Sequence, residues 1–220
     1  MAYDFIVTRR LWKDINLKVD YSYYKIKDYV VTANGKYRKM PKYSDHFNYV
    51  PKGAAGHGGS CRYNLDEMIR EGIEVSLDGH LLDNLSFYLN YVYLELKDKE
   101  GVPWGKDAVD ERAKHRVNAG LRYNLFKNTL LMLDYKFQDE QIAQTSEQVG
   151  YDEYIWYTVP MAAYHVFDFA IEQTLFKKYG YFKDAVAKFY INNLFDEEYE
   201  NKRGYPMTDC TCGGAISFRF

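Results

Sequence analysis

Four cationic side chains in one stretch of the chain have the spacing needed to bind an anion. All four fall on even-numbered positions, so they share one side of an extended strand. A cationic wall of this kind could attract an anionic solute by focusing its electrostatic field. The alternative is that these side chains pair with carboxylates such as Asp134 or Glu172. The four residues are Arg112, Lys114, Arg116 and Arg122.

Residue patterns of enzymes and metal proteins are not recognisable in this sequence. It contains no nucleophile at a strand-to-helix turn and no metal-binding histidine pair, so we expect no enzyme activity, metal site or cofactor. The cysteines Cys61, Cys210 and Cys212 lack the spacing of a metal framework, and the Cys-x-Cys spacing strains a direct disulfide. We interpret them as incidental, with a disulfide from Cys61 to one of the other two as the alternative.

The four cations belong to the clearest strand pattern in the chain, over 112–125, where apolar and polar residues alternate. About nine segments share this alternation. The sequence therefore predicts an all-β protein with an antiparallel, up-and-down sheet. The expected strands are 3–8, 15–31, 61–78, 85–94, 112–125, 130–138, 164–172, 186–192 and 215–220.

The connections between these strands alternate strictly in length. Short turns are expected near residues 13, 83, 127 and 180, and long loops at 35–60, 98–111, 141–160 and 196–208. Short turns at one end and long loops at the other are typical of transmembrane β-barrels of the outer membrane. A soluble β domain, the alternative class, has no reason to sort its loops in this way.

Composition agrees with a membrane barrel. Aromatic residues make up 18 % of the chain, including 23 tyrosines, which suits aromatic girdles at membrane interfaces. No segment approaches the ~20 apolar residues of a membrane helix, and the mean hydropathy is −0.51. The charged strand faces are too polar for a soluble core, so we expect them to line a lumen and the apolar faces to contact lipid. The net charge of −2 does not favour a nucleic-acid partner.

Several stretches resemble TonB-dependent outer-membrane receptors, in an order that covers the chain from about Tyr3 onward. Near the end, the similar residues are Asn192-Asn193-Leu194-Phe195-Asp196-Glu197-Glu198-Tyr199, then Gly204-Tyr205-Pro206-Met207, then Gly213-Gly214 to Phe220. Upstream they are Ile69-Arg70-Glu71-Gly72-Ile73-Glu74, Asp83-Asn84-Leu85-Ser86-Phe87 and Lys114-His115-Arg116-Val117-Asn118-Ala119-Gly120-Leu121.

The resemblance implies a barrel of about 22 strands whose lumen is closed by a plug domain. Such receptors import ferric siderophores, cobalamin, haem or similar scarce ligands, with energy from the TonB complex. The implied partners are outer-membrane lipid, the plug domain or the remaining barrel strands, the TonB complex and a metal-chelate ligand. The terminal aromatics Phe218 and Phe220 would serve as the membrane-assembly signal.

The chain departs from the family pattern in ways that set further expectations. We expect residues 1–220 to be one barrel segment, the last two-fifths of a receptor barrel, with plug domain, TonB box and signal peptide absent. Thr208 to Cys212 replace a Pro-Gly-Arg-like turn of the family. Nine is an odd strand count, so we expect no closed pore from this chain alone. The alternatives are a small outer-membrane pore, a structural barrel or a truncated remnant without function.

The resemblance also suggests roles for individual residues. Aromatic residues of the expected extracellular loops are candidates for ligand contact, and the cationic wall would attract an anionic ferric chelate. Two loop histidines, His46 and His57, could contact haem, although solvated histidines are the simpler interpretation. The aromatic candidates are Tyr43, Phe47, Tyr49, Trp104, Tyr154, Trp156 and Tyr157.

Overall fold

The computed structural model describes residues 1–12, 14–33, 61–98, 112–150 and 153–220. Within these ranges the regular structure consists of strands and turns. No helix in this described part of the chain is long and apolar enough to cross a membrane.

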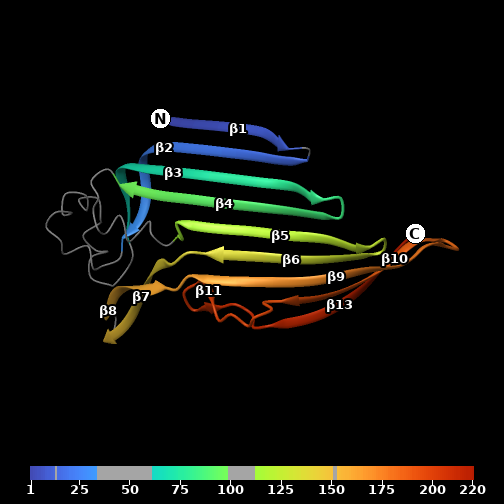
Figure 1. Ribbon diagram of the computed structural model, residues 1–220. Coiled ribbons are helices and arrows are strands. Elements are labelled where there is room, and N and C mark those ends of the chain that lie inside the picture. The colour runs from blue at the N-terminus through green and yellow to red at the C-terminus, as the bar shows by residue number, and fades with distance from the viewer. Residues whose placement is uncertain (13, 34–60, 99–111, 151–152) are drawn as a thin grey trace.

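Nine strands form one antiparallel sheet, in which each strand lies beside its neighbour along the chain apart from two small inserted ribbons (Figure 1). In sheet order, the strands are β1 (Ala2–Trp12), β2 (Ile15–Ala33), β3 (Cys61–Leu82), β4 (Leu85–Asp98), β5 (His115–Phe126), β6 (Thr129–Gln138), β9 (Tyr164–Tyr179), β10 (Phe182–Asn192) and β13 (Thr211–Arg219). The predicted up-and-down order of nine strands is therefore confirmed.

The inserted ribbons lie where long loops were expected. The first pairs β7 (Gln141–Gly150) with β8 (Glu153–Met161), and the second pairs β11 (Glu200–Lys202) with β12 (Tyr205–Pro206). The prediction of a loop over 141–160 is thus wrong, because β7 and β8 span most of this range. Tyr154, Trp156 and Tyr157 have high strand propensity, and a hairpin satisfies backbone groups that an open loop would leave to solvent.

The strand bounds also differ from prediction. Strands β2 and β4 run further towards the long-loop end than the alternation alone indicates. At the short-turn end, β3 continues to Leu82 and β9 to Tyr179, so the last short turn is tight. Gly180 adopts a φ of 58° in this turn, a conformation that glycine accepts without steric cost. β5 begins at His115 rather than at Arg112.

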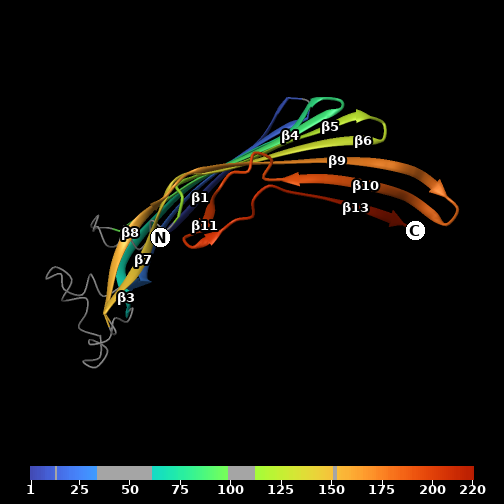
Figure 2. The same cartoon turned by 90° about the horizontal axis from the view of Figure 1, so that it is seen from below.

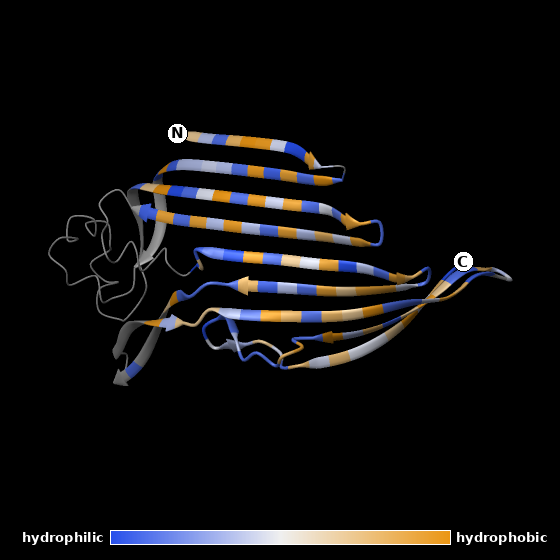
Figure 3. Cartoon of the chain, in the orientation of Figure 1, coloured by the Kyte–Doolittle hydropathy of each residue, from blue (hydrophilic) through white to orange (hydrophobic). Residues whose placement is uncertain are grey.

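The two faces of the sheet have opposite chemistry, as one pair of neighbouring transverse rows illustrates. Residues in register across strands share a face of the sheet. One row is polar across most of its length, with Asn16, Asp78, Tyr88, Gly120, Asp134 and Asp168. The adjacent row, on the other face, is apolar, with Leu17, Leu77, Leu89, Ala119, Tyr135 and Phe167. Figure 3 shows the resulting alternation of hydrophobic and hydrophilic bands along the strands.

We call the polar side the inner face and the apolar side the outer face. The segment 193–210 lies beneath the concave side of the curved sheet (Figure 2), and its Tyr199 contacts Tyr164 and Lys136 of the polar side. The inner face is therefore concave, which is the arrangement of a barrel wall with a polar lumen and a lipid-facing exterior.

The strands are staggered along the sheet. The short turns lie at one end and the long connections at the other (Figure 1). Asn16 follows the first short turn and lies in register with Asp78, but β3 continues past this level to Leu82. Phe126 and Thr129 likewise lie beyond the level of Tyr123, which pairs with Leu85 at the start of β4. Each turn is thus displaced in the same direction from the one before, as the tilted strands of a barrel require.

Both outermost strands of the sheet are edges. Every residue of β1 is exposed, including Phe5, Ile6 and Val7. On β13, Ile216 and Phe218 are exposed as well. In the described part of the chain, β1 pairs only with β2 and β13 only with β10, so each presents one unpaired backbone edge. The sheet is accordingly an open arc rather than a closed barrel (Figure 2).

Candidate ligand-binding pocket on the inner face

A network of polar side chains braces the middle of the inner face. Arg122 donates from Nη2 to both carboxylate oxygens of Asp134, at 2.7 and 3.0 Å. The Tyr88 hydroxyl donates to the same carboxylate at 2.7 Å, and the Arg122 guanidinium lies 5.7 Å from the Tyr88 ring centroid. Gly120 lies opposite Tyr88, and a Cβ there would be 2.3 Å from Tyr88 Cε1. Because Gly120 has no Cβ, the Tyr88 ring can pack directly against the backbone of β5 at this position.

Nearer the long-loop end, two tyrosine rings and a lysine form the centre of a second cluster. The ring centroids of Tyr164 and Tyr199 are 4.4 Å apart, and Tyr164 is only 2 % exposed. Lys136 Nζ lies 5.4 Å from the Tyr164 centroid and 6.0 Å from that of Tyr199, within range of a cation–π attraction. Burial raises the pKa of the Tyr199 hydroxyl, and the Lys136 ammonium opposes that rise. The Tyr199 phenol is consequently a neutral hydrogen-bonding group at ordinary pH.

The position of Tyr199 depends on a buried asparagine at the end of β10. Asn193 is 3 % exposed and adopts a left-handed φ of 51°, which asparagine tolerates better than most residues. Its backbone N–H donates to Asp168 Oδ1 at 2.8 Å. Its side chain accepts from Glu197 N–H at 2.9 Å and donates to the carbonyls of Glu197 and Thr208, at 2.9 and 3.3 Å. These bonds clamp both ends of the segment that carries Tyr199.

Two further bonds complete the fold of this segment. The Cys210 N–H donates to Asp196 Oδ1 at 2.6 Å, and the Tyr164 hydroxyl donates to Asn201 Oδ1 at 2.6 Å. Phe195 instead packs edge-on against Phe167 of the outer face, with ring centroids 5.2 Å apart. The stretch Asn193 to Tyr199 therefore anchors the segment to both faces of β9.

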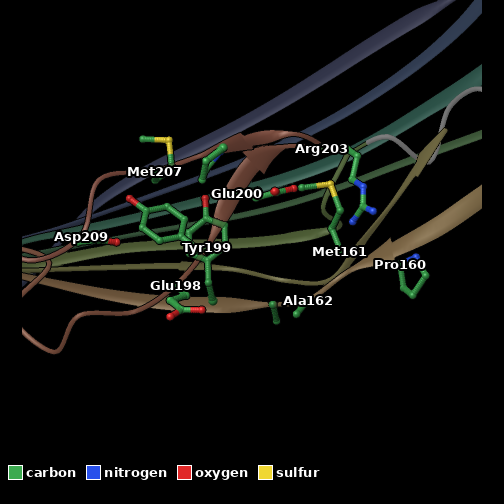
Figure 4. A pocket seen from close by; sticks show the side chains of 12 residues that line it. Pro160, Met161, Ala162, Glu198, Tyr199, Glu200, Arg203, Met207 and Asp209 are labelled. Carbon is green, nitrogen blue, oxygen red and sulfur yellow. The ribbon is translucent and has the colours of Figure 1, made fainter. Parts of the chain in front are cut away.

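The clamped segment and the β8–β9 corner enclose a pocket of about 430 Å³. Figure 4 shows side chains from both parts around it, with Tyr199 between them. The lining combines two aromatic rings, two thioethers and groups of both charges, so it can hold an organic solute by stacking and by hydrogen bonds. The main lining residues are Met161, Tyr164, Glu198, Tyr199, Glu200, Arg203, Met207 and Asp209.

The structure disperses the four cations expected to form one wall. Arg116 and Arg122 lie on the inner face of β5, and Arg116 shares a transverse row with Tyr164. Arg112 and Lys114 instead precede β5, and both border a second cavity of about 390 Å³. Lys114 Nζ forms an ion pair with Glu95 at 3.1 Å.

Carboxylate pairing, the alternative interpretation, is found for Arg122 with Asp134 at 2.7 Å. The other carboxylate considered, Glu172, pairs with Lys188 at 3.2 Å.

The aromatic candidates fall into two groups. Tyr43, Phe47, Tyr49 and Trp104, like His46 and His57, lie outside the described residues. The backbones of Tyr154, Trp156 and Tyr157 lie on β8, in register with Gln148, Ser146 and Thr145 of β7. That strand ends at Met161, one of the pocket residues.

The terminal aromatics and two of the cysteines lie elsewhere. Phe218 and Phe220 form an aromatic cluster with Phe182 at the short-turn end, with centroids 5.7 and 4.8 Å from that ring. Cys210 and Cys212 are free, exposed thiols, as the interpretation of incidental cysteines expects.

Sequence reasoning missed Lys136, Tyr164 and Asn193. The signal for Asn193 and Tyr199 was present, because both belong to the stretch after β10 that resembles the receptor family. No pattern marked Lys136 or Tyr164, since each is one polar position among many on an alternating strand.

Comparison with known proteins gives one family and a set of similar structures. Residues 6–194 match the family model described as TonB dependent receptor-like, beta-barrel. A comparison with curated protein sequences gives no match. Among solved structures, the ferripyoverdine receptor of the outer membrane of Pseudomonas aeruginosa, bound to ferripyoverdine, superposes with a TM-score of 0.70 at 11 % identity. It is matched over 98 % of this chain and 26 % of its own.

Two further structures show the same fold. The siderophore receptor PirA from Acinetobacter baumannii has a TM-score of 0.64 at 12 % identity, over 98 % of this chain and 31 % of its own. The copper transporter OprC has a TM-score of 0.65 at 14 % identity, over 98 % of this chain and 30 % of its own. The chain thus spans between about a quarter and a third of the length of these structures.

Proposed function

Because the chain belongs to the TonB-dependent receptor β-barrel family, we propose that it is a wall segment of a receptor that takes up ferric siderophores or similar scarce ligands. Cobalamin and haem are the other ligand classes that we include. The chain lies in the outer membrane of Gram-negative bacteria, as the barrels of this family do. Energy for uptake would come from the TonB complex acting on the whole receptor. Members of this family are transport receptors, which agrees with the expectation that the chain is not an enzyme.

The observation that carries this proposal is the pocket at the long-loop end of the inner face. Tyr199 offers stacking surface and Arg203 offers positive charge in the pocket lining. Lys136 and Arg116 add positive charge beside Tyr164, and Asn193 holds the segment that closes the pocket. A ferric chelate with aromatic groups and negative charge would find both kinds of contact there. The ferripyoverdine receptor and the siderophore receptor PirA, both among the similar structures, support this ligand class.

We also propose that further strands, supplied from outside residues 1–220, cover the free edges of β1 and β13. An unpaired edge in lipid leaves backbone N–H and C=O groups without partners, which costs several kcal/mol for each group. Those strands and a plug domain against the polar inner face are the partners that the segment requires. A small pore or structural barrel made by this chain alone is disfavoured by the same two edges.

Ligand binding by the receptor tests the proposal. Titration with anionic ferric chelates, followed by quenching of intrinsic fluorescence, should give saturable binding. Lys136→Met removes the ammonium beside the two tyrosine rings, and a lost charge–charge attraction of ~1.5 kcal/mol to an anionic chelate predicts binding about tenfold weaker. Lys183→Met, an exposed lysine next to the last short turn, is the matched control and should bind as the unmodified receptor does.

The results separate two failures. If no ferric chelate, cobalamin or haem binds the unmodified receptor, the proposed function is wrong. If a chelate binds equally well to the Lys136→Met and Lys183→Met variants, the function stands and the assignment of the pocket is wrong.

A further inference from the structure

Two tyrosine–histidine pairs with the same geometry lie on the outer face. Tyr91 Oη and His115 Nδ1 share a hydrogen bond of 2.8 Å between β4 and β5. Tyr135 Oη and His165 Nδ1 share one of 2.8 Å between β6 and β9. The ring centroids are 6.0 Å apart in both pairs, and the interplanar angles are 21° and 20°. Two separate strand pairs therefore build the same arrangement on the apolar side of the sheet.

Each histidine ring is fixed in place but keeps one nitrogen available. The His115 ring also packs on Tyr93 at 5.2 Å, and the His165 ring packs on Phe137 at 4.9 Å. The hydrogen bond to tyrosine occupies Nδ1. Within the described residues no protein group bonds Nε2 of either ring. When the tyrosine hydroxyl donates to Nδ1, the neutral imidazole carries its proton on Nε2 and is a donor there.

The Tyr91–His115 pair lies where the outer face changes from apolar to charged, and at the end of β6 the same change occurs from Phe137, opposite His165, to Asp139. Along β3 and β4, three successive cross-strand pairs are Leu77 with Leu89, Val75 with Tyr91 and Ile73 with Tyr93. The next pair towards the long loops is Glu71 with Glu95. Carboxylates do not face hydrocarbon, so the hydrocarbon of the membrane ends between the Tyr93 and Glu95 levels. This is the level of the lipid head groups on the long-loop side.

Two ammonium groups are held at this boundary. Lys97 Nζ lies 2.7 Å from Glu95 and 2.9 Å from Glu71, and Lys114 Nζ lies 3.1 Å from Glu95. The Tyr93 hydroxyl donates to Glu95 at 2.8 Å and so joins this ionic cluster to the aromatic ring that packs on His115. The two carboxylates balance the two ammonium groups, so the cluster offers a head group N–H donors rather than net positive charge, next to the donors of the histidines.

We propose that His115 and His165 bind the phosphate groups of outer-leaflet lipid. Nε2–H of each ring donates to a phosphate oxygen, the paired tyrosine fixes the direction of that donor, and the ammonium groups of Lys97 and Lys114 supply further N–H donors beside His115. The described residues contain no cluster of three or more metal-ligating side chains, so a bound metal ion is the weaker alternative. The inference requires only that the chain lies in the outer membrane and is independent of which solute the receptor takes up.

Retention of lipid by the purified receptor tests the inference. The receptor is extracted from outer membranes in mild detergent, washed with detergent, and analysed for bound phosphorylated lipid by native mass spectrometry and phosphorus assay. The His115→Phe/His165→Phe double variant keeps two rings for packing but removes both donors. We expect it to retain about tenfold less phosphorylated lipid than the unmodified receptor. His80→Phe, on β3 near the short-turn end, is the matched control and should retain the full amount.

Several results would overturn the inference. Equal retention by the double variant and the unmodified receptor removes the histidines from any lipid site. If inorganic phosphate binds the delipidated receptor as tightly as phosphorylated lipid does, the histidine rings bind free phosphate and not lipid. If the double variant does not assemble, His165→Phe alone applies the same comparison to an exposed ring and should lower retention about twofold. Full retention by that single variant also contradicts the proposal.

Discussion

Replacing Gly120 by alanine should disrupt the polar network that braces the inner face. The new Cβ would lie 2.3 Å from Tyr88 Cε1 and 2.6 Å from Asp134 Oδ1, both well inside van der Waals contact. The Tyr88 ring must move, and its 2.7 Å bond to Asp134 is lost with that movement. A hydrogen bond to a charged group contributes ~1.5–3 kcal/mol. Alanine recovers ~0.5–1 kcal/mol because glycine loses more backbone entropy on folding. We therefore expect a net loss of ~1–2 kcal/mol.

The assay is urea unfolding of the receptor in detergent micelles, for Gly120→Ala alone and in combination with Tyr88→Phe. The phenylalanine variant lacks the hydroxyl, so the part of the alanine penalty that comes from the lost bond to Asp134 should disappear in the double variant. Gly72→Ala is the control. Its Cβ would approach Ser22 Oγ at 2.8 Å, and a serine side chain can rotate away at little cost.

Two outcomes refute this reasoning. The first is an alanine variant as stable as the unmodified receptor, which would mean that the Tyr88 ring does not depend on the space above Gly120. The second is an undiminished penalty in the Tyr88→Phe background, which would mean that the loss arises from the backbone and not from the network.

Three other predictions concern the clamp, the ionic cluster and the sheet edges. Asn193→Ala removes two side-chain hydrogen bonds that Asn193 donates and one that it accepts, at a site that is 3 % exposed. We expect ~2–3 kcal/mol of local destabilisation, measured as faster proteolysis within 194–210. An unchanged rate of cleavage would contradict the role of Asn193 as a clamp. The hydrogen bond from Lys97 lowers the pKa of Glu95 to about 2. The ionised Glu95 carboxylate therefore stabilises the fold fully above pH 4.5, and this contribution to the free energy of unfolding is lost as the pH falls from 4.5 towards 2. The stability difference between the unmodified protein and Glu95→Gln should shrink over this range, and a constant difference opposes the assignment. The isolated 220-residue chain should give no single-channel conductance in planar bilayers and no heat-modifiable gel band.

The sheet could be predicted because its two faces meet different solvents. The alternation in β4 and β5 follows directly from a wall with lipid on one side and polar groups on the other, and the short turns follow from the antiparallel order. The β7–β8 hairpin could not be separated from a loop by its pattern. Its residues project beyond the main sheet, where no second face imposes alternation.

The pocket could be predicted only in part. A strand pattern places Lys136 and Tyr164 on the inner face but does not say which segment will cover them. The stretch from Asn193 to Tyr199 does cover them, through a left-handed residue and a set of local hydrogen bonds. Such bonds depend on the path of the backbone, which periodicity does not encode. For the same reason, the spacing of Arg112 and Lys114 predicted a strand from residue 112, whereas β5 begins at His115.

The exposed edge strand β1 has a consequence for the chain before it reaches the membrane. Phe5, Ile6 and Val7 form a short run of strong strand formers, and every backbone group on one side of this strand is open to pairing. In water, such an edge templates aggregation with other chains. Asp4 precedes the run, and Arg9 and Arg10 follow it. Charges at these positions oppose the stacking of identical strands, so the sequence carries its own gatekeepers for the interval between synthesis and insertion.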